Sequence, residues 1–79
     1  MSNSRSFTRL VGESIRFYRQ KSGFTQEKLA VRLKTSSEYI SALENGLKNV
    51  KVETLYKIGK VLDVDPQLFL AAKRNADEA

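Results

Sequence analysis

Small polar side chains crowd one predicted helical segment, residues 37–44, where an exposed helix normally carries charge. This segment reads SEYISALE, and residues 26–33 before it read QEKLAVRL. Its hydroxyls and carboxylate can hydrogen-bond to another molecule, and small side chains let a helix approach closely. Catalysis has few candidates, because the chain has no histidine, the commonest general base, and no cysteine to ligate zinc. We therefore expect a binding protein without enzymatic activity, metal, cofactor or small-molecule ligand.

The charge of the chain favours a polyanionic partner. Fourteen Lys and Arg against nine Asp and Glu give a net charge of +5, which favours nucleic acid first and a membrane surface second. No apolar run approaches the ~18 residues of a membrane span. The start, MSNSRSFTRL, lacks the apolar core of a secretory signal. We expect a cytoplasmic protein that does not associate with membranes.

Apolar residues recur at helical spacing along most of the chain, which predicts an all-α bundle of about five helices. With 79 residues and no cysteine, the core must come from helix packing, helped by dimerisation. The predicted helices cover about residues 8–21, 26–33, 37–44, 52–62 and 66–70. Residues 8–72 are predicted to form one domain between flexible ends, residues 1–7 and 73–79.

Two helices joined by a short turn, the second with a polar outer face, form a helix-turn-helix arrangement. The chain resembles the Cro/C1-type (XRE) helix-turn-helix family of bacterial and phage repressors. The resemblance rests on IRFYRQKSGFTQEKLA, SSEYISALENG and VETLYKIGKVLDVDPQLF, which match in register over about residues 10 to 70. It implies a lambda repressor-like fold and a transcription regulator that binds double-stranded DNA sequence-specifically.

The resemblance implies that residues 37–44 read base edges in the major groove. The candidate readers are Ser37, Glu38, Ser41 and Ala42. Glu38 can accept a hydrogen bond from cytosine N4, Ala42 can touch a thymine methyl, and serine pairs with either kind of edge. Alternatively, Glu38 only stabilises the positive end of the helix dipole.

The resemblance also implies contacts to the DNA backbone, from Gln26, Tyr39, Lys48, Asn49 and Lys51. The family uses a glutamine at this position to contact a phosphate and to brace the recognition helix. Gln26 lies at a predicted helix N-terminus, where free N–H groups favour an anion. Lys48, Asn49 and Lys51 follow the recognition helix and would add sequence-independent attraction. Alternatively, Gln26 and these loop residues are simply solvated, and Tyr39 belongs to the core.

Arg19 and Glu44 occupy positions where the family often keeps a pair that links the first helix to the end of the third. Such a pair would hold the recognition helix without reading DNA. The alternative is two exposed charges, whose interaction contributes under ~1 kcal/mol.

Two departures from the family pattern stand out. Lys34 replaces the usual glycine of the turn, so this turn either costs about 1 kcal/mol in a left-handed conformation or has another shape. The loop before the fourth helix reads NVKVETL and lacks the familiar proline. This form looks most like controller proteins of restriction–modification systems.

Apolar residues near the last two predicted helices provide a candidate homodimer surface; they are Val50, Val52, Tyr56, Leu68 and Leu70. A dimer would match a palindromic operator with half-sites about one DNA turn apart. The alternative is a protein-interaction or antitoxin-type module on the same fold. RNA is disfavoured, because the major groove of A-form RNA is too narrow for a helix.

Overall fold

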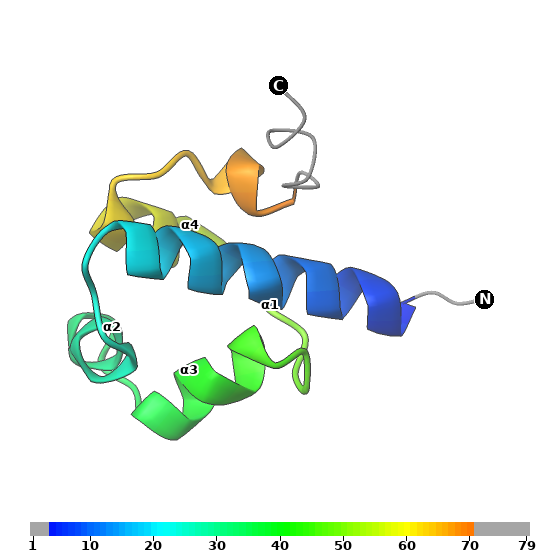
Figure 1. Ribbon diagram of the computed structural model, residues 1–79, viewed down its shortest axis with the longest axis horizontal. Helices are drawn as coiled ribbons and strands as arrows, with labels where there is room; N and C mark the ends of the chain where they lie inside the picture. The colour runs from blue at the N-terminus through cyan, green and yellow to red at the C-terminus, as the bar shows by residue number, and fades with distance from the viewer. Residues whose placement is uncertain (1–3, 71–79) are drawn as a thin grey trace.

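The computed structural model describes residues 4–70 and contains four α-helices and one short 3-10 helix in that range (Figure 1). They are α1 (Ser4–Lys21), α2 (Gln26–Leu33), α3 (Ser37–Glu44), α4 (Val52–Leu62) and η1 (Pro66–Phe69). No strand occurs in this part of the chain, and the all-α prediction is confirmed. The count of five helices is corrected to four α-helices, since the fifth element is a single 3-10 turn.

The last element begins at Pro66, as predicted, although it is a 3-10 helix and not an α-helix. Asp65 Oδ1 accepts a hydrogen bond from Gln67 N at 3.0 Å, and Pro66 occupies the first helical position. Only four residues follow the cap before the turn ends. A 3-10 helix suits such a short segment, because its hydrogen bonds close after three residues.

The first helix begins at Ser4, one turn earlier than the predicted start at Thr8. Ser and Asn near the start suggested a loose segment, but Phe7 extends the apolar stripe by lying four residues before Val11. Both line one apolar hollow on the surface. Residues 1–3 of the predicted flexible start and all of the predicted tail at 73–79 lie outside the described residues.

The long helix α1 crosses the middle of the molecule, with α2 and α3 on one side and η1 on the other, while α4 lies behind it (Figure 1). The core at their junction is apolar; its fully buried side chains include Ile15, Leu29, Ile40, Leu43, Ile58 and Phe69. Tyr18 of α1 meets Phe69 edge to face, with ring centroids 5.7 Å apart. All four α-helices and η1 therefore contribute side chains to one shared core.

Gly12 sets the distance between α1 and α3. A Cβ atom at this position would collide with the backbone oxygen of Leu43 and lie 2.8 Å from that of Glu44. The end of α3 therefore rests directly on the backbone of α1, so α1 supports the predicted recognition helix.

The turn between α2 and α3 takes the left-handed conformation at Lys34, with φ 60° and ψ 48°. Lys34 N donates to Val31 O at 3.1 Å, and Thr35 N donates to Ala30 O at 2.9 Å. These bonds satisfy carbonyls at the end of α2, as a helix C-cap requires. The turn therefore keeps the left-handed conformation that glycine usually provides, although Lys34 has a Cβ atom.

Candidate nucleic-acid interface

Both helices of the helix-turn-helix begin with a hydroxyl cap. Thr25 Oγ1 accepts from Lys28 N at 3.0 Å, and Ser36 Oγ accepts from Tyr39 N at 3.1 Å. Each cap satisfies one N–H of a first turn and leaves others available. Two helix N-termini with positive dipole ends are therefore ready to meet an anion.

The four predicted base readers lie together on the outer side of α3. Ile40, Leu43 and Glu44 are buried on the inner side. Glu38 is exposed, whereas Ser37, Ser41 and Ala42 are half-buried. Positions three and four residues apart share one face of a helix. Ser41 lies three and four residues after Glu38 and Ser37, and Ala42 lies four after Glu38, so a partner approaching α3 from solvent meets all four.

Ser41 has a partner that the sequence did not suggest. Asn45 Nδ2 donates to Ser41 Oγ at 3.3 Å. A serine oxygen that already accepts one hydrogen bond keeps its own hydrogen for an outside acceptor. The only sequence signal was the i, i+4 spacing, which by itself does not distinguish this bond from two solvated side chains.

Arg19 and Glu44 form a buried ion pair between α1 and the end of α3; the two residues are 7% and 3% exposed. Arg19 Nε donates to Glu44 Oε2, and a second guanidinium nitrogen donates to Oε1 at 3.0 Å. The third nitrogen donates to Phe24 O at 2.7 Å. Every guanidinium nitrogen thus has a partner, as a buried charge requires.

Gln26 joins this pair; the resemblance implied that it braces the recognition helix, but it did not name Glu44 as the partner. Its Nε2 donates to Glu44 Oε1 at 3.0 Å, so the start of α2 is tied to the end of α3. The amide nitrogen carries two hydrogens, and this bond uses one of them. The side chain can therefore brace α3 and still donate to an outside acceptor.

Tyr39 is half-buried and packs against the apolar core. Its ring therefore takes part in the core, the alternative weighed from the sequence. A contact between its hydroxyl and a phosphate stays a prediction.

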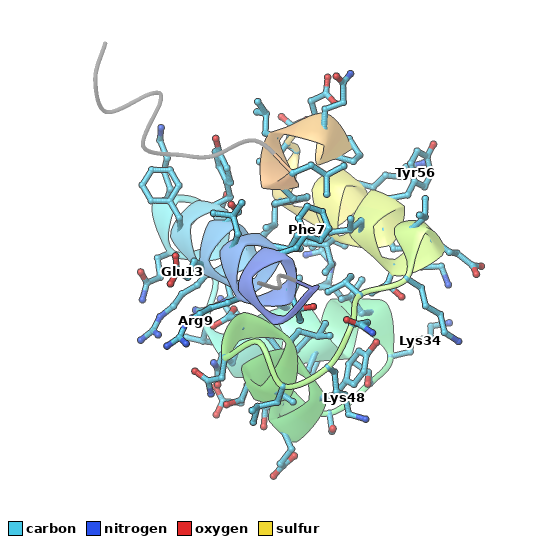
Figure 2. All side chains as sticks on the ribbon, turned by 90° about the vertical axis from the view of Figure 1, so that its right-hand side faces the viewer. Phe7, Arg9, Glu13, Lys34, Lys48 and Tyr56 are labelled. Carbon is cyan, nitrogen blue, oxygen red and sulfur yellow. The ribbon has the colours of Figure 1, made fainter. Side chains whose placement is uncertain are left out.

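Lys48, Asn49 and Lys51 are exposed on the loop between α3 and α4. Within residues 4–70, no acidic side chain lies within ion-pair distance of the two lysines. Figure 2 shows Lys48 at the lower edge of the molecule, beside α3. Two uncompensated cations thus lie on the loop that follows the predicted recognition helix.

An apolar groove of about 400 Å³ lies between the start of α1, the start of α4 and η1. Four of the five predicted dimer residues line it, together with Phe7; they are Val50, Val52, Tyr56 and Leu70. Leu68 is exposed but lies outside the groove lining. Phe7 points from α1 toward the α4 side, away from Arg9 and Glu13 (Figure 2). Phe7 was not predicted to line this surface, because the predicted helix began at Thr8, one residue later.

A family model described as a helix-turn-helix matches residues 15–69. The chain therefore belongs to the helix-turn-helix family, and the predicted Cro/C1-type membership is confirmed. No helix in the described range is both long enough and apolar enough to span a membrane.

Several relatives of this chain are controller proteins or regulators. The control protein C.BamHI from Bacillus amyloliquefaciens is 41% identical over 62 residues, which cover 77% of this chain and 76% of that protein. The restriction-modification controller protein C.AhdI from Aeromonas hydrophila has a TM-score of 0.80 at 25% identity, covering 86% of this chain and 99% of that one. The biofilm regulator SinR, solved in complex with DNA, has a TM-score of 0.72 at 31% identity, covering 77% of this chain and 98% of that one.

Proposed function

We propose that the protein is a transcription regulator that binds double-stranded DNA sequence-specifically as a homodimer. The observation that carries the proposal is the outer surface of α3, where small polar side chains lie over a buried network. Arg19, Gln26 and Glu44 join α3 to α1 and α2. A rigid helix with short side chains can enter the major groove of B-DNA deeply. The likeness to SinR, whose structure contains DNA, supports this proposal.

In the proposed complex, Ser37, Glu38, Ser41 and Ala42 contact base edges. Glu38 accepts from cytosine N4, and Ala42 contacts a thymine methyl. Ser41 donates its hydroxyl hydrogen to an acceptor such as guanine O6 or a purine N7 while its oxygen accepts from Asn45.

Contacts to the DNA backbone come from both sides of α3. Gln26 and the free N–H groups at the start of α2 bind one phosphate, while Lys48, Asn49 and Lys51 bind the other strand. Tyr39 adds a hydroxyl. Each lysine that neutralises a phosphate releases a counterion, so binding weakens as salt rises.

The homodimer forms through the apolar groove at the start of α4 and η1. Val52 is 82% exposed and Tyr56 is 56% exposed, so both apolar side chains are available to a second copy. Dimerisation would present two copies of α3 to a palindromic operator and double the phosphate contacts.

We further propose that the protein is a controller of a restriction–modification system. C.AhdI is described as a restriction-modification controller protein and C.BamHI as a control protein, and the proline-free loop NVKVETL supports the assignment. Regulation would follow from occupancy of a promoter, set by protein concentration through the dimer equilibrium.

Selection of bound duplexes from a random DNA library, followed by a salt titration on the winning sequence, tests the proposal. A palindromic consensus is expected, with affinity that falls steeply as salt rises. Lys51→Gln should reduce the salt slope by about two units, one for each protomer of the bound dimer, whereas Lys60→Gln, on the last turn of α4, should leave it unchanged. Binding equal for all sequences, or no binding, would instead favour a protein-interaction module, for which a pull-down is the next experiment.

A further inference from the structure

Thr8 and Asn49 are joined across 41 residues of sequence, between α1 and the loop that follows α3. Thr8 Oγ1 donates to Asn49 Oδ1 at 2.8 Å. An amide oxygen only accepts, and the neighbouring nitrogen only donates. The bond therefore fixes which side of the Asn49 amide faces α1. Within residues 4–70, no acceptor engages the nitrogen of this exposed side chain.

The loop around Asn49 is held on both sides. Gly46 has a positive φ of 74°, and a Cβ atom there would lie 2.9 Å from Arg9 Cα. The loop therefore leaves α3 in direct contact with the backbone of α1. After Asn49, Val50 packs against the core and Val52 lines the apolar groove. With its neighbours anchored this way, the direction of the Asn49 side chain depends on the bond from Thr8.

The early start of α1 places Thr8 inside the helix. Because α1 begins at Ser4, Thr8 lies in its second turn, and from there its hydroxyl reaches Asn49 of the loop.

We propose that Thr8 is a positioning residue for DNA: its hydroxyl holds Asn49 so that the amide nitrogen donates to a phosphate oxygen of the bound duplex. This inference rests on the proposed function, since it needs DNA against the loop between α3 and α4. Asn49 is neutral, so its contact adds affinity without releasing a counterion. The contact is also blind to sequence, because a phosphate is the same at every base pair.

Thr8→Val and Thr8→Ser are compared for DNA affinity, salt slope and dimerisation. Valine keeps the branched shape and removes the donor, whereas serine keeps the donor. Thr8→Val is expected to weaken binding about three- to tenfold per protomer on every duplex, as expected for one neutral hydrogen bond, and about ten- to hundredfold for the dimer. Thr8→Ser should stay within about twofold, and the salt slope should not change in either variant.

A double-mutant cycle with Asn49→Ala tests whether Thr8 acts through Asn49. In that background, Thr8→Val is expected to cause no further loss of affinity. Asn49→Asp retains an acceptor for Thr8 but replaces the donor with a negative charge, so it should bind DNA more weakly than Asn49→Ala.

The proposal is overturned if Thr8→Val binds as tightly as the wild type, or if it weakens Asn49→Ala as much as it weakens the wild type. Because Thr8 also lines the apolar groove, dimerisation is measured without DNA by sedimentation velocity. A change in the dimer constant that accounts for the whole loss would also overturn it. If the wild type binds no duplex, the proposed function fails and this inference fails with it. If the wild type binds DNA in a salt-dependent way and Thr8→Val has the same affinity, this inference fails while the proposed function stands.

Discussion

Glu44 accepts hydrogen bonds from two different elements while it lies in the core. Arg19 reaches it from α1 and Gln26 from α2. Removing the carboxylate would leave the Arg19 guanidinium, which is 7% exposed, buried without its charge partner. The position of α3 therefore depends on one acidic side chain at its last residue.

Glu44→Ala is expected to lower the free energy of unfolding by about 3 to 5 kcal/mol, the usual cost of breaking a buried pair on one side. Urea denaturation followed by circular dichroism measures it. Glu13→Ala is the matched control, because the ion pair between Glu13 and Arg9 joins side chains that are 52% and 70% exposed. That control should cost under about 1 kcal/mol, and equal losses in both variants would refute the account of Glu44.

A side-chain contact could be predicted where both residues belong to a recognised motif. The resemblance pointed to Arg19 and Glu44, because both positions belong to matching motifs. Nothing in the sequence pointed to the bond between Thr8 and Asn49, since its members are 41 residues apart and polar residues at such positions are commonly solvated. The resemblance implied a bracing role for Gln26, but its partner Glu44 could not be named, because a family role does not specify which side chain is contacted.

At the scale of elements, the turn between α2 and α3 carries the clearest strain. Lys34 has φ 60°, a conformation that costs a residue with a Cβ about 1 kcal/mol or more. Lys34→Gly is therefore expected to raise the free energy of unfolding by up to about 1 kcal/mol, reduced by the greater entropy of glycine in the unfolded chain.

Lys57→Gly is the control for that prediction, because Lys57 is an exposed residue inside α4. Glycine there should destabilise the protein by roughly 0.5 to 1 kcal/mol. The two substitutions remove the same side chain, so opposite signs in the same denaturation assay would isolate the backbone effect. A destabilised Lys34→Gly variant would show that the lysine side chain contributes more than its backbone costs.

Elements with a clear apolar period and a cap were predictable in kind and place. Thr25 and Ser36 cap α2 and α3, and both helices begin at the predicted residue. The predicted start of α1 was wrong by one turn. Its first residues are Ser and Arg, which can lie in a helix without adding to the apolar spacing from which the helix was predicted. The last element proved to be a 3-10 turn because a cap signal says where a helix starts and not how it continues.

At the scale of the molecule, the apolar groove and the polar surface of α3 are separate features of one small domain. Val52→Glu would place a charge where Val52 lines the groove. The expected result in sedimentation velocity without DNA is a monomer, because a second copy would have to desolvate the carboxylate.

Val31→Glu is the control for that variant, since Val31 is 73% exposed but lies on α2, outside the groove lining. It should remain dimeric at the same concentration. A Val52→Glu protein that dimerises like the wild type would place the dimer contact elsewhere.

Base reading by α3 is tested by repeating the random-duplex selection with Glu38→Ala and Glu53→Ala beside the wild type. Both glutamates lie in the first turn of a helix, but only Glu38 lies on the outer side of α3. We predict a palindromic consensus for the wild type and for Glu53→Ala. For Glu38→Ala, preference should be lost at one symmetric pair of positions, by about 1 to 3 kcal/mol per contact. An unchanged consensus for Glu38→Ala would show that Glu38 contacts no base. The absence of a consensus for every protein, the wild type included, would show that α3 does not read bases.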